Sequence, residues 1–110
     1  MQFTQNKEGV FLVLEVEGRM DAATSSQFEA HCLGCLEAGD KRLVVDLSKL
    51  EYISSAGLRS ILSAAKKLKG AGGDMAFCAM GGIVAEVFAV SGFSKLFPTF
   101  PSRQEALARS

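Results

Sequence analysis

The chain has 110 residues, 48% of them hydrophobic, and its 12 lysines and arginines balance 12 aspartates and glutamates. This length suits one compact domain, so we expect a single domain over residues 1–110. The balanced charge provides no long-range field that would gather nucleic acid or an anionic membrane surface, so neither is an expected partner. No stretch is apolar for long enough to span a bilayer, and the N-terminus lacks a basic, apolar leader, which predicts a cytoplasmic protein.

The first half of the chain predicts a hairpin, a helix and a buried strand, in that order. Turn residues at 6–9 separate a short apolar stretch from residues 10–16, which are rich in strand formers, and this pattern favours a β-hairpin. Apolar residues near helical spacing predict a helix over residues 22–38, ending at Gly39. The continuous apolar run 43–47 is typical of a parallel strand buried on both faces.

The second half alternates helices with strands. The clearest helix contains an apolar stripe at three- and four-residue spacing, formed by Leu58, Ile61, Leu62, Ala65 and Leu68. We expect a buried strand at 75–80, a helix at 83–90, an edge strand at 97–100 and a last helix through 102–107. Strands that alternate with helices predict an α/β fold: a mainly parallel sheet, an antiparallel N-terminal hairpin and about four helices.

Segment 46–58 is the candidate functional site, because it leads from a buried strand into the clearest helix. Loops beyond the carboxyl ends of strands commonly form the sites of α/β sheets. Ser54 and Ser55 stand at the helix entrance, where we expect one of them to cap the helix. A phosphate at this position would lie beside unpaired amides and the positive end of the helix dipole. Phosphorylation is therefore expected to spare the fold and to change the surface that docks over the helix start.

Residues 46–48 and 53–58 together resemble the signature of the STAS domain family, in the branch of bacterial anti-sigma factor antagonists. Residues 18–21 and 92–97 resemble further segments of the same family, so the similarity extends along the chain. The resemblance implies the STAS fold. The phosphorylated serine of the family lies two residues before a Gly-Leu pair, which implies Ser55 here. Ser54 occupies a position where family members often carry aspartate, and it is the second candidate for modification.

The resemblance also implies a partner-switching function. The unphosphorylated domain would bind an anti-sigma factor that has serine kinase activity, phosphorylation of Ser55 would release it, and a serine phosphatase would restore the binding form. We expect the partner-binding residues to be Asp21, Asp46, Ser54, Ser55, Ala56, Gly57, Leu58 and Arg59. Asp21 and Asp46 are the candidate acidic neighbours of the phosphate, although a helix cap for Asp21 and a strand-end turn for Asp46 are equally compatible with the sequence. The expected oligomeric state is a monomer or weak dimer.

Two other functions are alternatives to the switch. A STAS domain can also serve as a constitutive adaptor subunit of a transporter or signalling complex, and the serine at the helix start favours the switch instead. An enzyme has little support, because no base, nucleophile and orienting group can be placed together. We therefore expect no catalytic residue and no cofactor.

Cys32, Cys35 and the adjacent His31 form the other group that invites a chemical interpretation. A zinc site needs about four ligands, and the third cysteine, Cys78, lies on a predicted buried strand. A redox pair would lie at a helix start, whereas this pair is in the middle of a helix. We interpret the cysteines as packed thiols, with no metal site, and His31 as an exposed helix residue.

Overall fold

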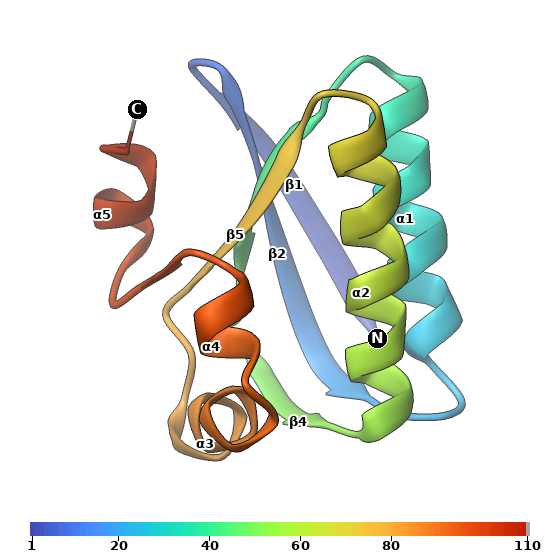
Figure 1. The fold of residues 1–110 in the computed structure, drawn as a ribbon, viewed down its shortest axis with the longest axis vertical. Helices are drawn as coiled ribbons and strands as arrows, with labels where there is room; N and C mark the ends of the chain where they lie inside the picture. The colour runs from blue at the N-terminus through green and yellow to red at the C-terminus, as the bar shows by residue number, and fades with distance from the viewer. Residues whose placement is uncertain (110) are drawn as a thin grey trace.

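The structure is a computed structural model, and it describes residues 1–109 as a mixed sheet with helices on both faces (Figure 1). The strands are β1 (Gln2–Glu8), β2 (Phe11–Met20), β3 (Arg42–Asp46), β4 (Leu50–Ile53), β5 (Asp74–Cys78) and β6 (Thr99–Phe100). The helices are α1 (Ser25–Glu37), α2 (Ser55–Gly70), α3 (Gly82–Ser91), α4 (Phe93–Leu96) and α5 (Arg103–Leu107). The predicted α/β class is confirmed. No helix in residues 1–109 is long and apolar enough to cross a membrane.

The sheet runs in the order β1-β2-β3-β5-β6, and β4 pairs with β2 off this path. The hairpin pair β1–β2 is antiparallel, and the other pairs are parallel. This arrangement confirms the predicted parallel sheet with an antiparallel N-terminal addition. Strand β2 has two parallel neighbours along its length. Its first half pairs with β3, and its last residues pair with β4.

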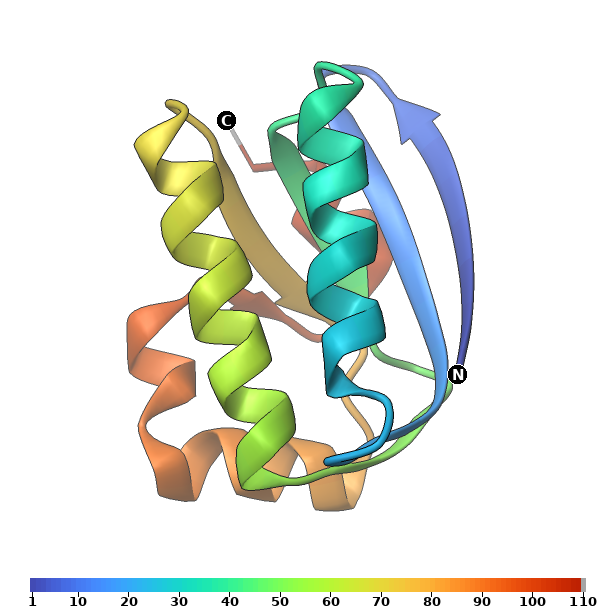
Figure 2. The ribbon, with the colours of Figure 1, turned by 90° about the vertical axis from the view of Figure 1, so that its right-hand side faces the viewer.

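Two layers of side chains hold the helices to the sheet. Helices α1 and α2 lie side by side over one face, as Figure 2 shows, and their apolar residues share the main core with Leu14, Leu43 and Phe77. Helix α5 lies against the opposite face (Figure 1). The small core beneath it consists of Phe11, Val13, Val44, Cys78 and Ala106. Alternate residues of β3 therefore face different helices, since successive side chains of a strand point to opposite faces.

The structure has one strand and one helix more than the sequence predicts. Strand β4 lies inside segment 46–58, which we expected to be a loop, and it lets β2 extend through Gly18 to Met20. Its four residues carry no apolar alternation long enough to signal a strand. The additional helix α4 is a single turn that follows Gly92, which takes a left-handed conformation with φ of 83°.

His31 is half-buried, so the prediction that it is an exposed helix residue is wrong. Its Nε2 lies 2.8 Å from Oε1 of Gln5, and its ring stacks on Phe3 with 4.5 Å between centroids. Both partners belong to β1, the edge strand of the sheet that α1 covers. The edge strand therefore covers a helix position that local spacing alone would leave in solvent.

Cys32, Cys35 and Cys78 are all buried and unpaired, as the sequence interpretation predicted. Cys32 and Cys35 belong to the core beneath α1, and Cys78 belongs to the core beneath α5. Burial raises the pKa of the Cys32 thiol far above its usual value and that of Cys78 to about 11. Thiols with raised pKa values are poor nucleophiles at neutral pH.

We expect these thiols to be protected from a bulky disulfide reagent in the folded protein. Labelling should be at least about a hundredfold slower under native conditions than in urea, because a buried thiol reacts only from an opened state. Reagent absorbance gives the rate, and the double variant Cys32→Ala, Cys35→Ala isolates the contribution of Cys78. Rapid labelling of the native protein would contradict the packed arrangement.

Candidate functional site

The N-terminus of α2 is fixed by Ser54, which is its N-cap residue. The Ser54 hydroxyl accepts a hydrogen bond from the Gly57 amide at 3.3 Å, and the Ser54 carbonyl accepts from the Leu58 amide at 3.0 Å. The Ser54 amide donates to the Met20 carbonyl at 2.9 Å. The expectation that one of the two serines caps the helix is thus confirmed, and the capping residue is Ser54.

Ser55 is the first residue of α2, and it is exposed. Within residues 1–109, the backbone amides of Ser55 and Ala56 donate no hydrogen bond. The first turn of α2 contains no acidic side chain that would occupy the positive end of the helix dipole. A hydroxyl at this position is accessible to another protein, and an anion attached to it would meet unpaired amides.

Gly57 allows α2 to lie against the ends of β2 and β4. A Cβ atom at this position would lie 2.8 Å from Cγ1 of Ile53 and 2.9 Å from the carbonyl oxygen of Met20. Both distances are shorter than real Cβ contacts, so a side chain there would push the helix away from the sheet. Gly57 therefore acts through the position of the helix start, and it is itself buried.

Asp21 lies beside this helix start, because it follows Met20 directly along the chain. Its carboxylate accepts hydrogen bonds from the amides of Ala23 at 3.0 Å and Thr24 at 3.2 Å. The Ala23 amide is the largest influence that holds the pKa of Asp21 below its usual value. Asp21 thus closes the turn before α1, in which Thr24 is the N-cap residue, and it directly follows Met20, whose carbonyl accepts from the Ser54 amide.

A shallow groove of about 500 Å³ runs between the N-terminal halves of α1 and α2. Its lining residues are Ala22, Ser25, Ser26, Glu29, Ala56, Arg59, Ser60 and Ser63. The Ser60 hydroxyl donates to the Ser25 carbonyl at 2.6 Å, which holds the two helices together at the base of the groove. The Glu29 carboxylate accepts from the Ser63 hydroxyl and pairs with the Lys67 ammonium at 3.0 Å. Leu58 is half-buried and packs against the core, so it shapes the helix from below.

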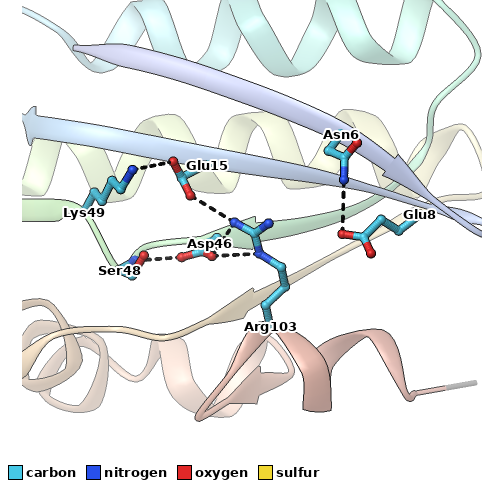
Figure 3. Close-up of polar contacts among 7 residues, drawn as sticks. All are labelled: Asn6, Glu8, Glu15, Asp46, Ser48, Lys49 and Arg103. Carbon is cyan, nitrogen blue, oxygen red and sulfur yellow. Dashed lines mark hydrogen bonds and ion pairs between the residues drawn. The ribbon is translucent and has the colours of Figure 1, made fainter.

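Asp46 does not share this surface, so the expectation that it neighbours a phosphate on Ser55 is wrong. It alternates along β3 with Val45, which faces the helices, and its own side chain points to the α5 face. There it accepts from Nε and Nη2 of Arg103 at 3.0 and 2.8 Å (Figure 3). Its second oxygen accepts from the Ser48 amide at 2.9 Å, which is the strand-end turn considered above.

The charges around Asp46 form a network across the α5 face. Nη2 of Arg103 also pairs with Glu15 at 3.0 Å, and Glu15 pairs with Lys49 at 3.1 Å (Figure 3). Burial opposes ionisation of Asp46, but the Ser48 amide and the Arg103 guanidinium outweigh it and hold its pKa below the usual value. The side chain of Asp46 is only 6% exposed, so this carboxylate stabilises the fold and presents little surface to a partner.

Sequence reasoning missed Arg103 and Tyr52 as polar partners. Arg103 lies 57 residues after Asp46, and no spacing rule connects positions so far apart. Tyr52 stacks beneath the guanidinium of Arg19, whose Cζ lies 4.4 Å from the ring centroid. That contact depends on the parallel pairing of β2 with β4, which places the two residues opposite each other.

Fold and site together define a small α/β domain that carries an accessible serine at the start of the helix covering its sheet. Residues 3–106 match the STAS domain family, and the chain belongs to that family. It is 39% identical over 108 residues to BtrV of Bordetella bronchiseptica, which is named as an anti-sigma factor antagonist, with 98% of this chain and 93% of that protein covered.

Solved structures give the same fold. An anti-sigma factor antagonist from Mycobacterium paratuberculosis superposes with a TM-score of 0.86 at 25% identity, over 96% of this chain and 90% of that chain. The phosphorylated form of SpoIIAA from Bacillus superposes with a TM-score of 0.72 at 18% identity, over 96% of both chains. The predicted STAS fold is therefore confirmed.

Substituting Gly57 by alanine should destabilise the protein by about 1–3 kcal/mol, because the added methyl group overlaps Met20 and Ile53. Urea unfolding at equilibrium measures this change. Gly70→Ala is the matched control, since Gly70 ends the same helix and nothing lies within 4 Å of its Cβ position. Equal stability of Gly57→Ala and wild type would refute the close contact.

The Asp46 network should make the free energy of unfolding depend on pH in the acidic range. Because the folded-state pKa of Asp46 is lowered, its stabilisation is present at neutral pH and is lost as pH falls below the ordinary value of 3.8. Asp46→Asn should cost about 2 kcal/mol near neutral pH, and the difference from wild type should shrink toward about pH 3. Urea unfolding across this range tests the sign. A difference that is constant with pH would contradict an ionised Asp46.

Proposed function

We propose that this chain is an anti-sigma factor antagonist whose binding is switched by phosphorylation of Ser55. The observation that carries the proposal is the exposed hydroxyl of Ser55 at the first position of α2, beside amides that have no partner in residues 1–109. The names of BtrV and of the Mycobacterium paratuberculosis protein support the partner class, since both are called anti-sigma factor antagonists. On this proposal the protein works in the cytoplasm as a binding regulator.

A phosphate on Ser55 is expected to weaken partner binding and to leave the fold intact. A phosphate adds about 1.5 to 2 negative charges, which the unpaired amides and the helix dipole would stabilise. An interface fitted to a neutral hydroxyl would instead have to desolvate that charge. The Asp21 carboxylate is held in the turn before α1 by the Ala23 and Thr24 amides, and this turn follows Met20, which contacts the helix start, so Asp21 adds negative charge to the same region.

Ser55 is the better substrate of the two serines. The Ser54 hydroxyl already accepts a hydrogen bond from Gly57, and Ser54 is half-buried. A kinase acting on Ser54 would have to open the cap of α2, whereas Ser55 projects from the helix without such a bond. The existence of a phosphorylated form of SpoIIAA, a protein of the same fold, is consistent with a modified serine in this class.

The proposed partner surface consists of the helix start and the turn before α1. Asp21, Ser54, Ser55, Ala56 and Arg59 present side chains there, while Gly57 and Leu58 set its shape from beneath. Asp46 lies outside this surface. The proposed cycle has three steps. The unphosphorylated domain sequesters an anti-sigma factor that has serine kinase activity. Phosphorylation of Ser55 releases the anti-sigma factor, and a serine phosphatase restores binding.

Ser55→Asp should fold normally and bind the anti-sigma factor at least about tenfold more weakly than Ser55→Ala, a difference of about 1.4 kcal/mol. Enzymatically phosphorylated protein should lose more affinity, because phosphoserine carries more charge than aspartate. Titration calorimetry against the same partner measures both, with circular dichroism to verify folding. Ser54→Ala is the control and should still be phosphorylated and still switch. Equal affinities of the phosphorylated and unphosphorylated proteins would leave a constitutive adaptor as the function.

A further inference from the structure

Arg59 shares a helix face with Ser55. Both residues are exposed, and Arg59 follows Ser55 by four positions, which places the two side chains one turn apart on the same side of α2. Side chains on an α-helix lean toward its N-terminus, so the turn that contains Ser55 is within reach of the Arg59 side chain. An acidic group four residues before a basic one is also the favoured orientation of a helical ion pair.

The guanidinium of Arg59 forms no ion pair within residues 1–109, whereas Glu29, which lines the same groove, and Asp21, in the turn before α1, both have other partners. Asp21 accepts from two backbone amides, and Glu29 accepts from Ser63 and pairs with Lys67. Arg59 lines the groove between α1 and α2 together with Ala56, so its charge lies at the rim of that groove. A cation without a partner, one turn from a modifiable hydroxyl, is suited to receive a phosphate.

We propose that Arg59 is the internal counter-charge for a phosphate on Ser55; this inference rests on the function proposed above. In the phosphorylated protein the planar guanidinium pairs with the phosphate oxygens across one helical turn. The pair draws Arg59 away from the groove, so modification removes a positive charge from the rim while it adds a negative charge at the helix start. One phosphate thereby changes two parts of the partner surface.

Protein with phosphoserine incorporated at position 55 during translation allows a test without kinase or partner. Phosphorus NMR follows the second ionisation of the phosphate against pH. Since Arg59 favours the dianion, the midpoint should rise by about 0.2 pH units or more in Arg59→Gln, and the rise should shrink at high salt. Arg59→Lys should fall between wild type and Arg59→Gln, because lysine keeps the charge but lacks the planar fork.

Lys66→Gln is the matched control. Lys66 is exposed on the same face of α2, about three turns after Ser55 and about two turns after Arg59. Its loss therefore removes the same charge at a distance from the phosphate. The charged residues Arg19, Asp21, Glu29 and Glu51, on the elements that adjoin the helix start, are present in every variant. An unchanged midpoint in Arg59→Gln, or an equal rise in Lys66→Gln, would overturn the proposal. Either result is independent of partner affinity, so it leaves the proposed switch to its own calorimetric test.

Discussion

The contact between the end of β2 and the start of α2 is the constraint on which the site depends. The Met20 carbonyl accepts from the Ser54 amide at 2.9 Å, and Gly57 leaves no side chain between the helix and that carbonyl. The contact requires β4 to bring the chain alongside β2 before the helix begins. The Ser54 hydroxyl caps the helix by accepting from the Gly57 amide. The next residue, Ser55, has an exposed hydroxyl. The accessibility of Ser55 is thus a consequence of the backbone packing of Ser54, one residue before it, and of Gly57, two residues after it.

The two faces of the sheet have different roles. The face that carries α1 and α2 leads to the groove and the exposed serine, and the polar contacts between these helices include the hydrogen bond from Ser60 to Ser25 and the ion pair of Glu29 with Lys67. The opposite face has a buried carboxylate, Asp46, held by Arg103 and by its own turn. Losing one partner of such a buried pair is costly, which suits a structural role. The sheet therefore separates a rigid charged network from the surface proposed to change its charge.

Local patterns in the sequence were sufficient for the long elements and for the helix cap. The apolar stripe of α2 has the period of a helix, the short continuous apolar run of β3 has the length of a buried strand, and the serines at 54 and 55 mark a helix start by their chemistry. The remaining features depend on tertiary pairing. Strand β4 is too short to show a period, Asp46 takes its partner from 57 residues away, and His31 contacts side chains of the edge strand β1. No local rule contains such information.

Arg103 joins α5 to strands from the first half of the chain, pairing with Glu15 across 88 residues and with Asp46 across 57. During synthesis on the ribosome, strands β1 to β5 and the helices α1 and α2 emerge before the segment that contains Arg103. The apolar residues beneath α5, including Phe11 and Val44, therefore stay uncovered until the segment that forms α5 leaves the exit tunnel. A newly made chain passes through an interval in which one face is packed and the other still exposes hydrophobic surface to chaperones.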